Sequence, residues 1–177
     1  MINLNADVVR DFLVRLGQRY DEPANLYLVG GAALCLLGSL RPTLDLDYVG
    51  SDIRKDALQQ AIDALATEMQ LDVEAVPLEQ MIPLPVGAEQ RSQLIGQFGN
   101  ITASIFDPYS IAFSKLARGF DTDIDDVVFL LHHGLLTLPQ LESVVNHGMR
   151  DGQKFDIMPS ELRNNWRALQ QRLSRAQ

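Results

Sequence analysis

The chain has 177 residues, with 15 Lys or Arg against 23 Asp or Glu, which gives a formal net charge of −8. Its length and 46% hydrophobic content indicate a folded globular protein and exclude a mainly disordered chain. The single cysteine, Cys35, excludes an intrachain disulfide and a cysteine-based zinc site. Residues 1–25 show no secretory signal, and no apolar run reaches the roughly 20 residues that span a bilayer. We therefore expect a cytoplasmic protein with no membrane partner.

The charge is unevenly distributed along the chain. Residues 150–177 have a net charge of +3, and the other residues together have a net charge of −11. A body this acidic repels polyanions, so we do not expect broad nucleic-acid binding. The basic end includes Arg163 and Arg167, one helical turn apart, which indicate a solvated helix face or, as the alternative, a contact with RNA phosphates.

Hydrophobic periodicity predicts both strands and helices. Alternation of apolar and polar residues over 44–49 and 71–76 indicates strands with one exposed face. Apolar residues at helical spacing indicate the helices. In chain order the predicted elements are a helix that contains Val8 to Leu16, a strand over 26–29, a helix over 32–37, a strand over 44–49, a helix over 53–69, strands over 71–76 and 97–106, and helices over 108–118, 123–133, 138–147 and 160–175.

Local signals predict where some of these elements begin. Ser51 and Asp52 are predicted to cap the helix that follows them, and Thr122 with Asp125 matches a capping box. Prolines between residues 77 and 90 are expected to exclude regular structure from that segment.

This order of elements predicts an α/β (α+β) fold, in which a small mixed β-sheet head is flanked by helices and followed by a helical C-terminal tail. We expect the head to comprise residues 1–134. Residues 135–177 are expected to form a helical extension packed on the head, so that the two make one structural unit.

Two features in the first third of the chain suggest chemistry. Gly30 and Gly31 stand at a predicted strand-to-helix turn, where the missing side chains let backbone N–H groups approach a phosphate. Asp45 and Asp47 are two residues apart in a strand, so both carboxylates lie on one face, about 6.6 Å apart along it. The apolar residues that alternate with them are expected on the opposite face: Leu44, Leu46 and Tyr48. Carboxylates at this spacing can bind a divalent cation or a metal pair, although each feature taken alone is more typical of a tight turn or a solvated strand face.

With Arg41 and Thr43 just before the aspartates, these features resemble the nucleotidyltransferase superfamily of the DNA polymerase β type. In that superfamily Gly-Gly at a strand end is followed by a helix and then by Asp-x-Asp; here 13 residues separate Gly31 from Asp45. The segment DPYSIAFSKLARGFDTDIDDVVFLL is similar to the helical half of bacterial stand-alone members, which include AbiEii-type toxins. The positions that match those members are Lys115, Arg118, Asp123 and Asp126.

The resemblance implies that Asp45 and Asp47 ligate Mg²⁺, as a two-metal site if the protein is active, and that an NTP is the substrate. It implies transfer of a nucleoside monophosphate to an acceptor, either RNA, a protein or a small molecule. A toxin–antitoxin setting, with a cognate antitoxin as partner, is one option. The residues that the resemblance assigns to nucleotide binding are Gly30, Gly31, Arg41, Thr43, Lys115 and Asp126, and Lys115 is also a candidate catalytic group.

The superfamily usually has a third carboxylate, and here the sequence offers several. Asp72 is our preferred catalytic candidate, with Glu74 and Asp107 as alternatives. Ala32 follows the glycines where many active members have Ser or Thr. The alternative function is therefore a catalytically inactive nucleotidyltransferase-like module that binds a nucleotide or a protein.

Overall fold

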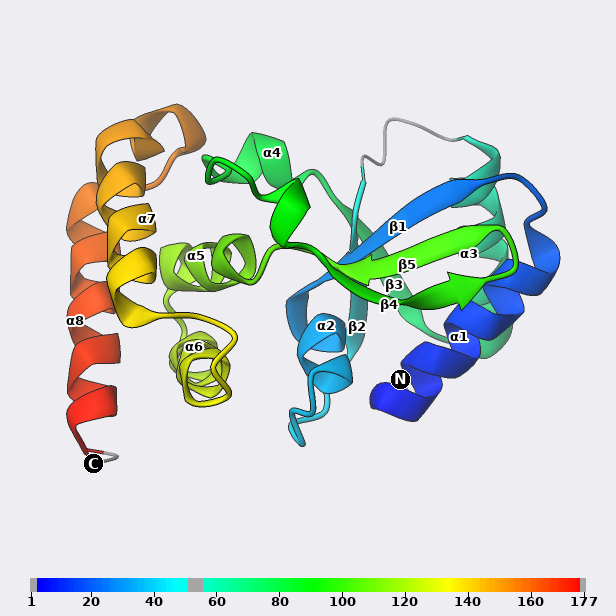
Figure 1. Ribbon diagram of the computed structural model, residues 1–177, viewed down its shortest axis with the longest axis horizontal. Helices are drawn as coiled ribbons and strands as arrows, with labels where there is room; N and C mark the ends of the chain where they lie inside the picture. Colours follow the sequence, from blue (N-terminus) through cyan, green and yellow to red (C-terminus); the bar gives the residue numbers. More distant parts are fainter. Residues whose placement is uncertain (1–2, 51–55, 176–177) are drawn as a thin grey trace. The chain divides into compact units, whose positions relative to one another are not determined.

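The computed structural model describes residues 3–50 and 56–175, which form two compact units (Figure 1). The first unit comprises residues 1–77 and 92–106, and the second comprises residues 78–91 and 107–177. The chain therefore passes from one unit to the other after Pro77, after Arg91 and after Phe106. The sequence prediction, in contrast, divides the chain only once, at residue 134.

The first unit is built on a five-stranded mixed sheet, in the strand order β3-β2-β1-β5-β4. Strand β1 pairs antiparallel with β2 and parallel with β5, while β2 pairs parallel with β3 and β4 pairs antiparallel with β5. The strands are β1 (Ala24–Val29), β2 (Asp45–Val49), β3 (Asp72–Val76), β4 (Gln93–Phe98) and β5 (Ile101–Ile105). This sheet confirms the predicted α/β fold class.

Three helices belong to the first unit: α1 (Ala6–Arg19), α2 (Gly30–Leu36) and α3 (Ala57–Met69). Helix α1 begins where the Asn5 side chain accepts hydrogen bonds from the backbone N–H groups of Asp7 and Val8. Its buried face packs against α2, α3 and β4. The residues of that face are Val9, Phe12, Leu13 and Leu16, as the helical spacing predicts.

The start of α3 differs from the prediction. The helix is capped by Asp56, whose Oδ1 accepts a hydrogen bond from the Gln59 N–H at 2.9 Å. It therefore begins at Ala57, and residue 53, the predicted start, lies outside the described residues. Ser51 and Asp52, the predicted caps, lie outside the described residues.

The single strand predicted over 97–106 is wrong. The structure has two antiparallel strands, β4 and β5, joined by a turn at Gly99 and Asn100. Gly99 has φ +56°, and a Cβ there would lie 2.2 Å from the Gly17 carbonyl oxygen. Apolar residues on both sides of the turn make the segment resemble one longer strand, whereas the Gly-Asn pair is the signal of a tight hairpin turn.

The second unit is helical. It contains α4 (Leu78–Met81), α5 (Pro108–Arg118), α6 (Asp121–His132), α7 (Leu138–Asp151), α8 (Pro159–Arg175) and two short 3₁₀ helices, η1 (Glu89–Arg91) and η2 (Gly152–Phe155). Helix α5 packs against α6, α7 and α8, and α8 also packs against α6 and α7. Helices α7 and α8 confirm that the predicted C-terminal tail, residues 135–177, is helical. Helices α4 and η1 correct the prediction that residues 77–90 lack regular structure.

The predicted capping box of α6 is also wrong. The helix begins at Asp121, and its N-cap is Phe120, which has no side-chain capping bond. Thr122 and Asp125 therefore lie within the helix, and Asp125 pairs with Arg172 of α8 instead. Over residues 3–50 and 56–175, none of the helices has the length and apolar character required to cross a bilayer.

Candidate functional site

The two candidate metal ligands lie on one face of β2. Asp45 is exposed and Asp47 is half-buried, whereas Leu46 and Tyr48 between and beside them are buried. The structure thus confirms the predicted alternation within the strand. Leu44 does not follow it, because this residue precedes β2 and is 47% exposed.

A second pair of carboxylates lies beside the first. In the parallel pairing of β2 with β3, Asp45 is in register with Asp72, and Asp47 is in register with Glu74. Paired residues on adjacent strands share a face, and the strands are about 4.8 Å apart. Asp72 and Glu74 are both exposed. Four acidic side chains therefore line one face of these two strands.

The described residues contain no group of three or more His, Cys, Asp or Glu side chains arranged to hold a metal ion. Mg²⁺ in proteins is commonly bound by one or two carboxylates, with waters and substrate phosphates as the other ligands. The pair formed by Asp45 and Asp47 suits that kind of binding.

Asp107, the remaining candidate for the third carboxylate, belongs to the second unit and is fully buried. Its carboxylate caps α5 by accepting hydrogen bonds from the N–H groups of Tyr109 and Ser110 and from the Ser110 hydroxyl. It also accepts two bonds from Arg91, Nε to Oδ1 at 2.7 Å and Nη2 to Oδ2 at 2.9 Å. The hydrogen bond to Asp107 raises the pKa of Arg91. Because both oxygens of Asp107 already have several donors, this residue serves the structure of the second unit.

The two glycines allow side chains from β2 and from the loop before it to lie against the start of α2. Gly30 has φ +63°, and a Cβ there would lie 1.9 Å from Oδ2 of Asp47. A Cβ on Gly31 would lie 2.4 Å from Oγ1 and 2.6 Å from Cβ of Thr43. The structure therefore brings four of the predicted site residues together: Gly30, Gly31, Thr43 and Asp47.

The backbone of the loop before β2 is held at Arg41 and at Thr43. The Leu4 N–H donates to the Thr43 carbonyl at 2.8 Å, and the Thr43 N–H donates back to Leu4 at 3.3 Å. The buried Cys35 thiol donates to the Arg41 carbonyl at 3.4 Å. Arg41 itself has an exposed side chain on this loop. These bonds position Thr43 beside Gly31.

The opposite face of β2 is buried. Tyr48 is 7% exposed, and burial raises its pKa to about 12, with further contributions from the charges of Asp56 and Asp63. The phenol is therefore protonated at neutral pH. Strand β2 thus has one apolar face in the core and one acidic face that a ligand can reach.

Lys115 and Asp126, the other predicted site residues, bind each other in the second unit. The Lys115 Nζ lies 2.6 Å from Asp126 Oδ2 and 3.5 Å from Asp123 Oδ1. Arg118 Nη2 lies 2.7 Å from Asp123 Oδ1. Lys115, Asp123 and Asp126 are each 3% exposed. The segment that contains Lys115, Arg118, Asp123 and Asp126 therefore forms an ion-pair network that joins α5 to α6. The spacing of its basic and acidic residues in the sequence was the signal from which this pairing could have been predicted.

Comparison with protein families gives a match over almost the whole chain. The family model described as "Nucleotidyltransferase of unknown function (DUF6036)" matches residues 8–173. This match includes β2, β3, the two glycines and the ion-pair network. Comparisons with curated proteins and with solved structures gave no match.

Proposed function

The chain belongs to this family of nucleotidyltransferases, and from that premise we propose that it transfers a nucleoside monophosphate from an NTP to an acceptor, with Mg²⁺ bound by Asp45 and Asp47. The observation that carries the proposal is the acidic face of β2. Its two aspartates alternate with buried residues, and Asp47 lies directly against Gly30 at the start of α2. Bound Mg²⁺ would supply charge neutralisation and orientation of the NTP phosphates.

The residues around this pair have separate proposed roles. Asp45 is exposed and can reach a ligand, while Asp47 lies against the backbone of Gly30. Asp72, in register with Asp45, is proposed to orient the acceptor and take its proton. Glu74, beside Asp47, is the alternative for that role.

Phosphate binding is assigned to the loop and the turn of the first unit. Arg41 has an exposed guanidinium, which suits it to pair with a phosphate. Gly30 and Gly31 let a phosphate approach the backbone of the turn. Lys115 is not assigned a phosphate contact, because its ammonium is buried and bound to Asp126. Lys115 and Asp126 instead hold α5 and α6 together.

A second candidate function is a nucleotide-binding module without catalysis. The observation that favours it is that Asp72 and Glu74, although they pair in register with Asp45 and Asp47, do not complete a metal-holding group of three or more carboxylates in the part of the chain that the structure describes. Ala32 adds to this, because it is fully buried in α2 and presents no hydroxyl to a phosphate. The two functions differ in one measurable respect, which is turnover.

A transfer assay tests the proposal. The purified chain is incubated with Mg²⁺ and each α-labelled NTP, with total RNA and cell lysate as acceptor pools. We expect label on a macromolecule, and a loss of about 10³-fold or more in the Asp45→Asn/Asp47→Asn variant, because the metal-dependent stabilisation of the transition state is removed. Asp11→Asn, an exposed carboxylate of α1, is the matched control and should retain full transfer.

The same proteins distinguish the second candidate. Mg²⁺-dependent NTP binding that is lost in the double variant, without transfer of label from any NTP, would establish the binding module. Transfer that persists in the double variant would contradict the assignment of Asp45 and Asp47.

A further inference from the structure

The second unit contains a pocket of about 270 Å³ between α7 and the segment 83–91. One wall is formed by a single face of α7, because the lining residues are three or four positions apart: Gln140, Ser143, Val144, His147 and Arg150. The other wall consists of Pro83, Pro85, Val86 and Arg91. All these residues belong to the same compact unit.

The orientation of α7 is fixed by its other face. Leu141, Val145 and Gly148 are buried. Gly148 lies so close to Phe113 of α5 that a Cβ there would be 2.2 Å from the Phe113 Cζ. The helix therefore cannot turn its pocket face into the core, and the side chains of that face stay available to a ligand.

The pocket presents two guanidinium groups in an acidic protein. The chain has 23 acidic and 15 basic residues, yet no Asp or Glu is among the residues that line this pocket. Arg91 and Arg150 both line it. Arg150 is exposed, and it has no ion pair with any residue in the described part of the chain.

Arg91 is a preorganised cation. Its Nε and Nη2 are held by the fully buried Asp107, and its Nη1 donates to the Val86 carbonyl at 2.7 Å. An arginine has five N–H groups, so two remain for a ligand. Because the side chain is already fixed, a ligand would not have to order it, which lowers the entropic cost of binding.

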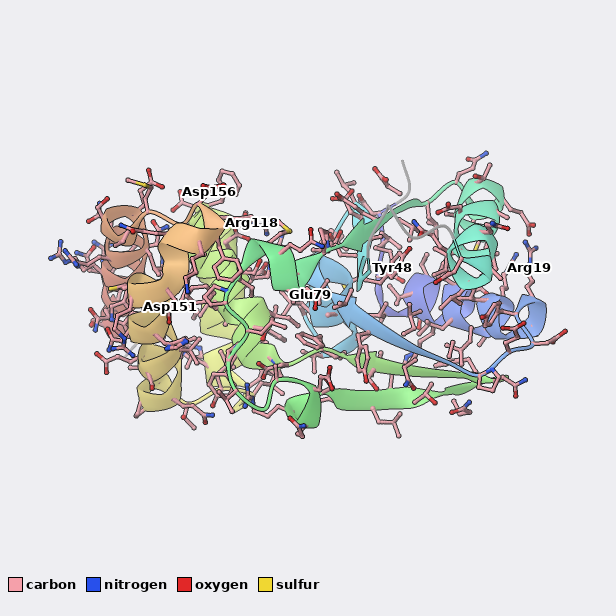
Figure 2. The ribbon with its side chains drawn as sticks, turned by 90° about the horizontal axis from the view of Figure 1, so that it is seen from above. Arg19, Tyr48, Glu79, Arg118, Asp151 and Asp156 are labelled. Carbon is pink, nitrogen blue, oxygen red and sulfur yellow. The ribbon has the colours of Figure 1, made fainter. Side chains whose placement is uncertain are left out.

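The rest of the lining provides an apolar surface and two neutral hydrogen-bonding groups. Pro83, Pro85 and Val144 are half-buried, and Val86 is 97% exposed. Gln140 and Ser143 offer an amide and a hydroxyl. His147 pairs with Asp151, one helical turn along α7, at 3.2 Å between Nε2 and Oδ2; Figure 2 marks Asp151 on this helix.

We propose that this pocket binds a small organic anion, whose apolar body lies against Pro83, Pro85 and Val144 and whose phosphate or carboxylate group is bound by Arg91 and Arg150. The volume is near the lower limit for small-molecule sites, which suits a single ring with one anionic group. The site uses none of the residues assigned above to Mg²⁺ or to the NTP.

Titration of the full chain in EDTA tests the proposal, because chelation removes any contribution from divalent metal at Asp45 and Asp47. The probes are phenyl phosphate, phenylacetate and inorganic phosphate. Their binding is monitored by the chemical shifts of the backbone amides in NMR spectra. We expect saturable shifts at Gln140, Ser143 and Val144 with one or both aromatic anions. Arg150→Gln should weaken that binding by about tenfold, since a charge-assisted hydrogen bond is lost. Arg163→Gln, an exposed arginine of α8, is the matched control and should leave the affinity unchanged.

The probes also identify the anionic group. Stronger binding of phenyl phosphate indicates a phosphorylated ligand, and stronger binding of phenylacetate indicates a carboxylate; either supports the site. Binding of inorganic phosphate as tight as that of both aromatic anions would contradict an apolar subsite. No saturable binding, shifts confined to other residues, or equal losses in Arg150→Gln and Arg163→Gln would overturn the proposal.

Discussion

Carboxylates of the first unit are exposed along two neighbouring strands, whereas the key carboxylates of the second unit are buried and bound to cations. Asp45 and Asp72 face solvent in register with each other. Asp123 and Asp126 are 3% exposed and share the ammonium of Lys115. An exposed carboxylate can bind a new cation at little cost, but a buried one that gives up its partner leaves an uncompensated charge in the protein interior.

This difference in burial distinguishes the two candidate ligand-binding motifs of the sequence, the first around Asp45 and Asp47 and the second around Lys115 and Asp126. Both contain acidic and basic residues at regular spacing, and either could be taken for a ligand site. The degree of burial shows that only the first is open to a metal or a nucleotide. The second has its charges matched within α5 and α6 and stabilises the helical unit.

The largest effect on stability is expected from the buried network. Lys115→Met removes the cation shared by Asp123 and Asp126, and we expect it to lower the free energy of unfolding by about 3–5 kcal/mol. Urea denaturation measures this change. Asp45→Asn should change the same quantity by less than about 0.5 kcal/mol, because Asp45 is exposed. Similar losses in the two variants would contradict the contrast between the units.

A smaller effect is expected at the turn that supports the acidic face. Gly31→Ala places a methyl group 2.6 Å from the Cβ of Thr43, and we expect a loss of about 2–3 kcal/mol from this overlap. Thr43→Gly removes the opposing atoms, so the double variant should recover part of that loss. A double-mutant cycle by chemical denaturation measures the coupling. Additive effects would show that the contact between Gly31 and Thr43 does not determine the cost.

The smallest effect concerns the core face of β2 at high pH. Burial raises the pKa of Tyr48 to about 12 in the folded protein, whereas an unfolded tyrosine titrates near pH 10. The stability that follows from this difference is fully present below about pH 10 and is lost as the pH rises toward 12, by no more than about 2 kcal/mol. Unfolding at pH 9 and pH 12 measures it. Tyr48→Phe should show a smaller loss, and Tyr27→Phe should keep the full loss because it retains Tyr48.

Alternation and helical spacing predicted most of the fold because they depend on neighbours in sequence. The alternation of Asp45 and Asp47 with buried residues is visible in the strand itself, and the structure reproduces it. The hairpin of β4 and β5 was missed, because a two-residue turn at Gly99 leaves the apolar runs on its two sides almost continuous. Where two apolar runs are separated by only a short turn, a turn-forming residue such as Gly99 has to be given more weight than the runs themselves.

The candidate site could be predicted only in part, because its support comes from contacts between distant segments. The sequence shows Gly30 and Gly31 but not the close approach of Asp47 and Thr43 that requires them. It shows Asp107 before a proline, which is typical of a helix start, but not the pairing with Arg91, 16 residues earlier. It offers Lys115 as a phosphate ligand, and only the structure shows the ammonium bound to Asp126. Register, burial and pairing depend on the tertiary fold.

The chain crosses between the two units three times, after Pro77, Arg91 and Phe106. This has a consequence for any attempt to produce one unit without the other. No single proteolytic cut or stop codon separates the first unit from the second. A fragment that ends at Pro77 would lack β4 and β5, and β5 is the strand that pairs with β1. An isolated sheet unit would require a new linker from Pro77 to Ser92 in place of the excised segment. Deletion variants of this protein should therefore be designed around interleaved segments rather than around an N-terminal and a C-terminal half.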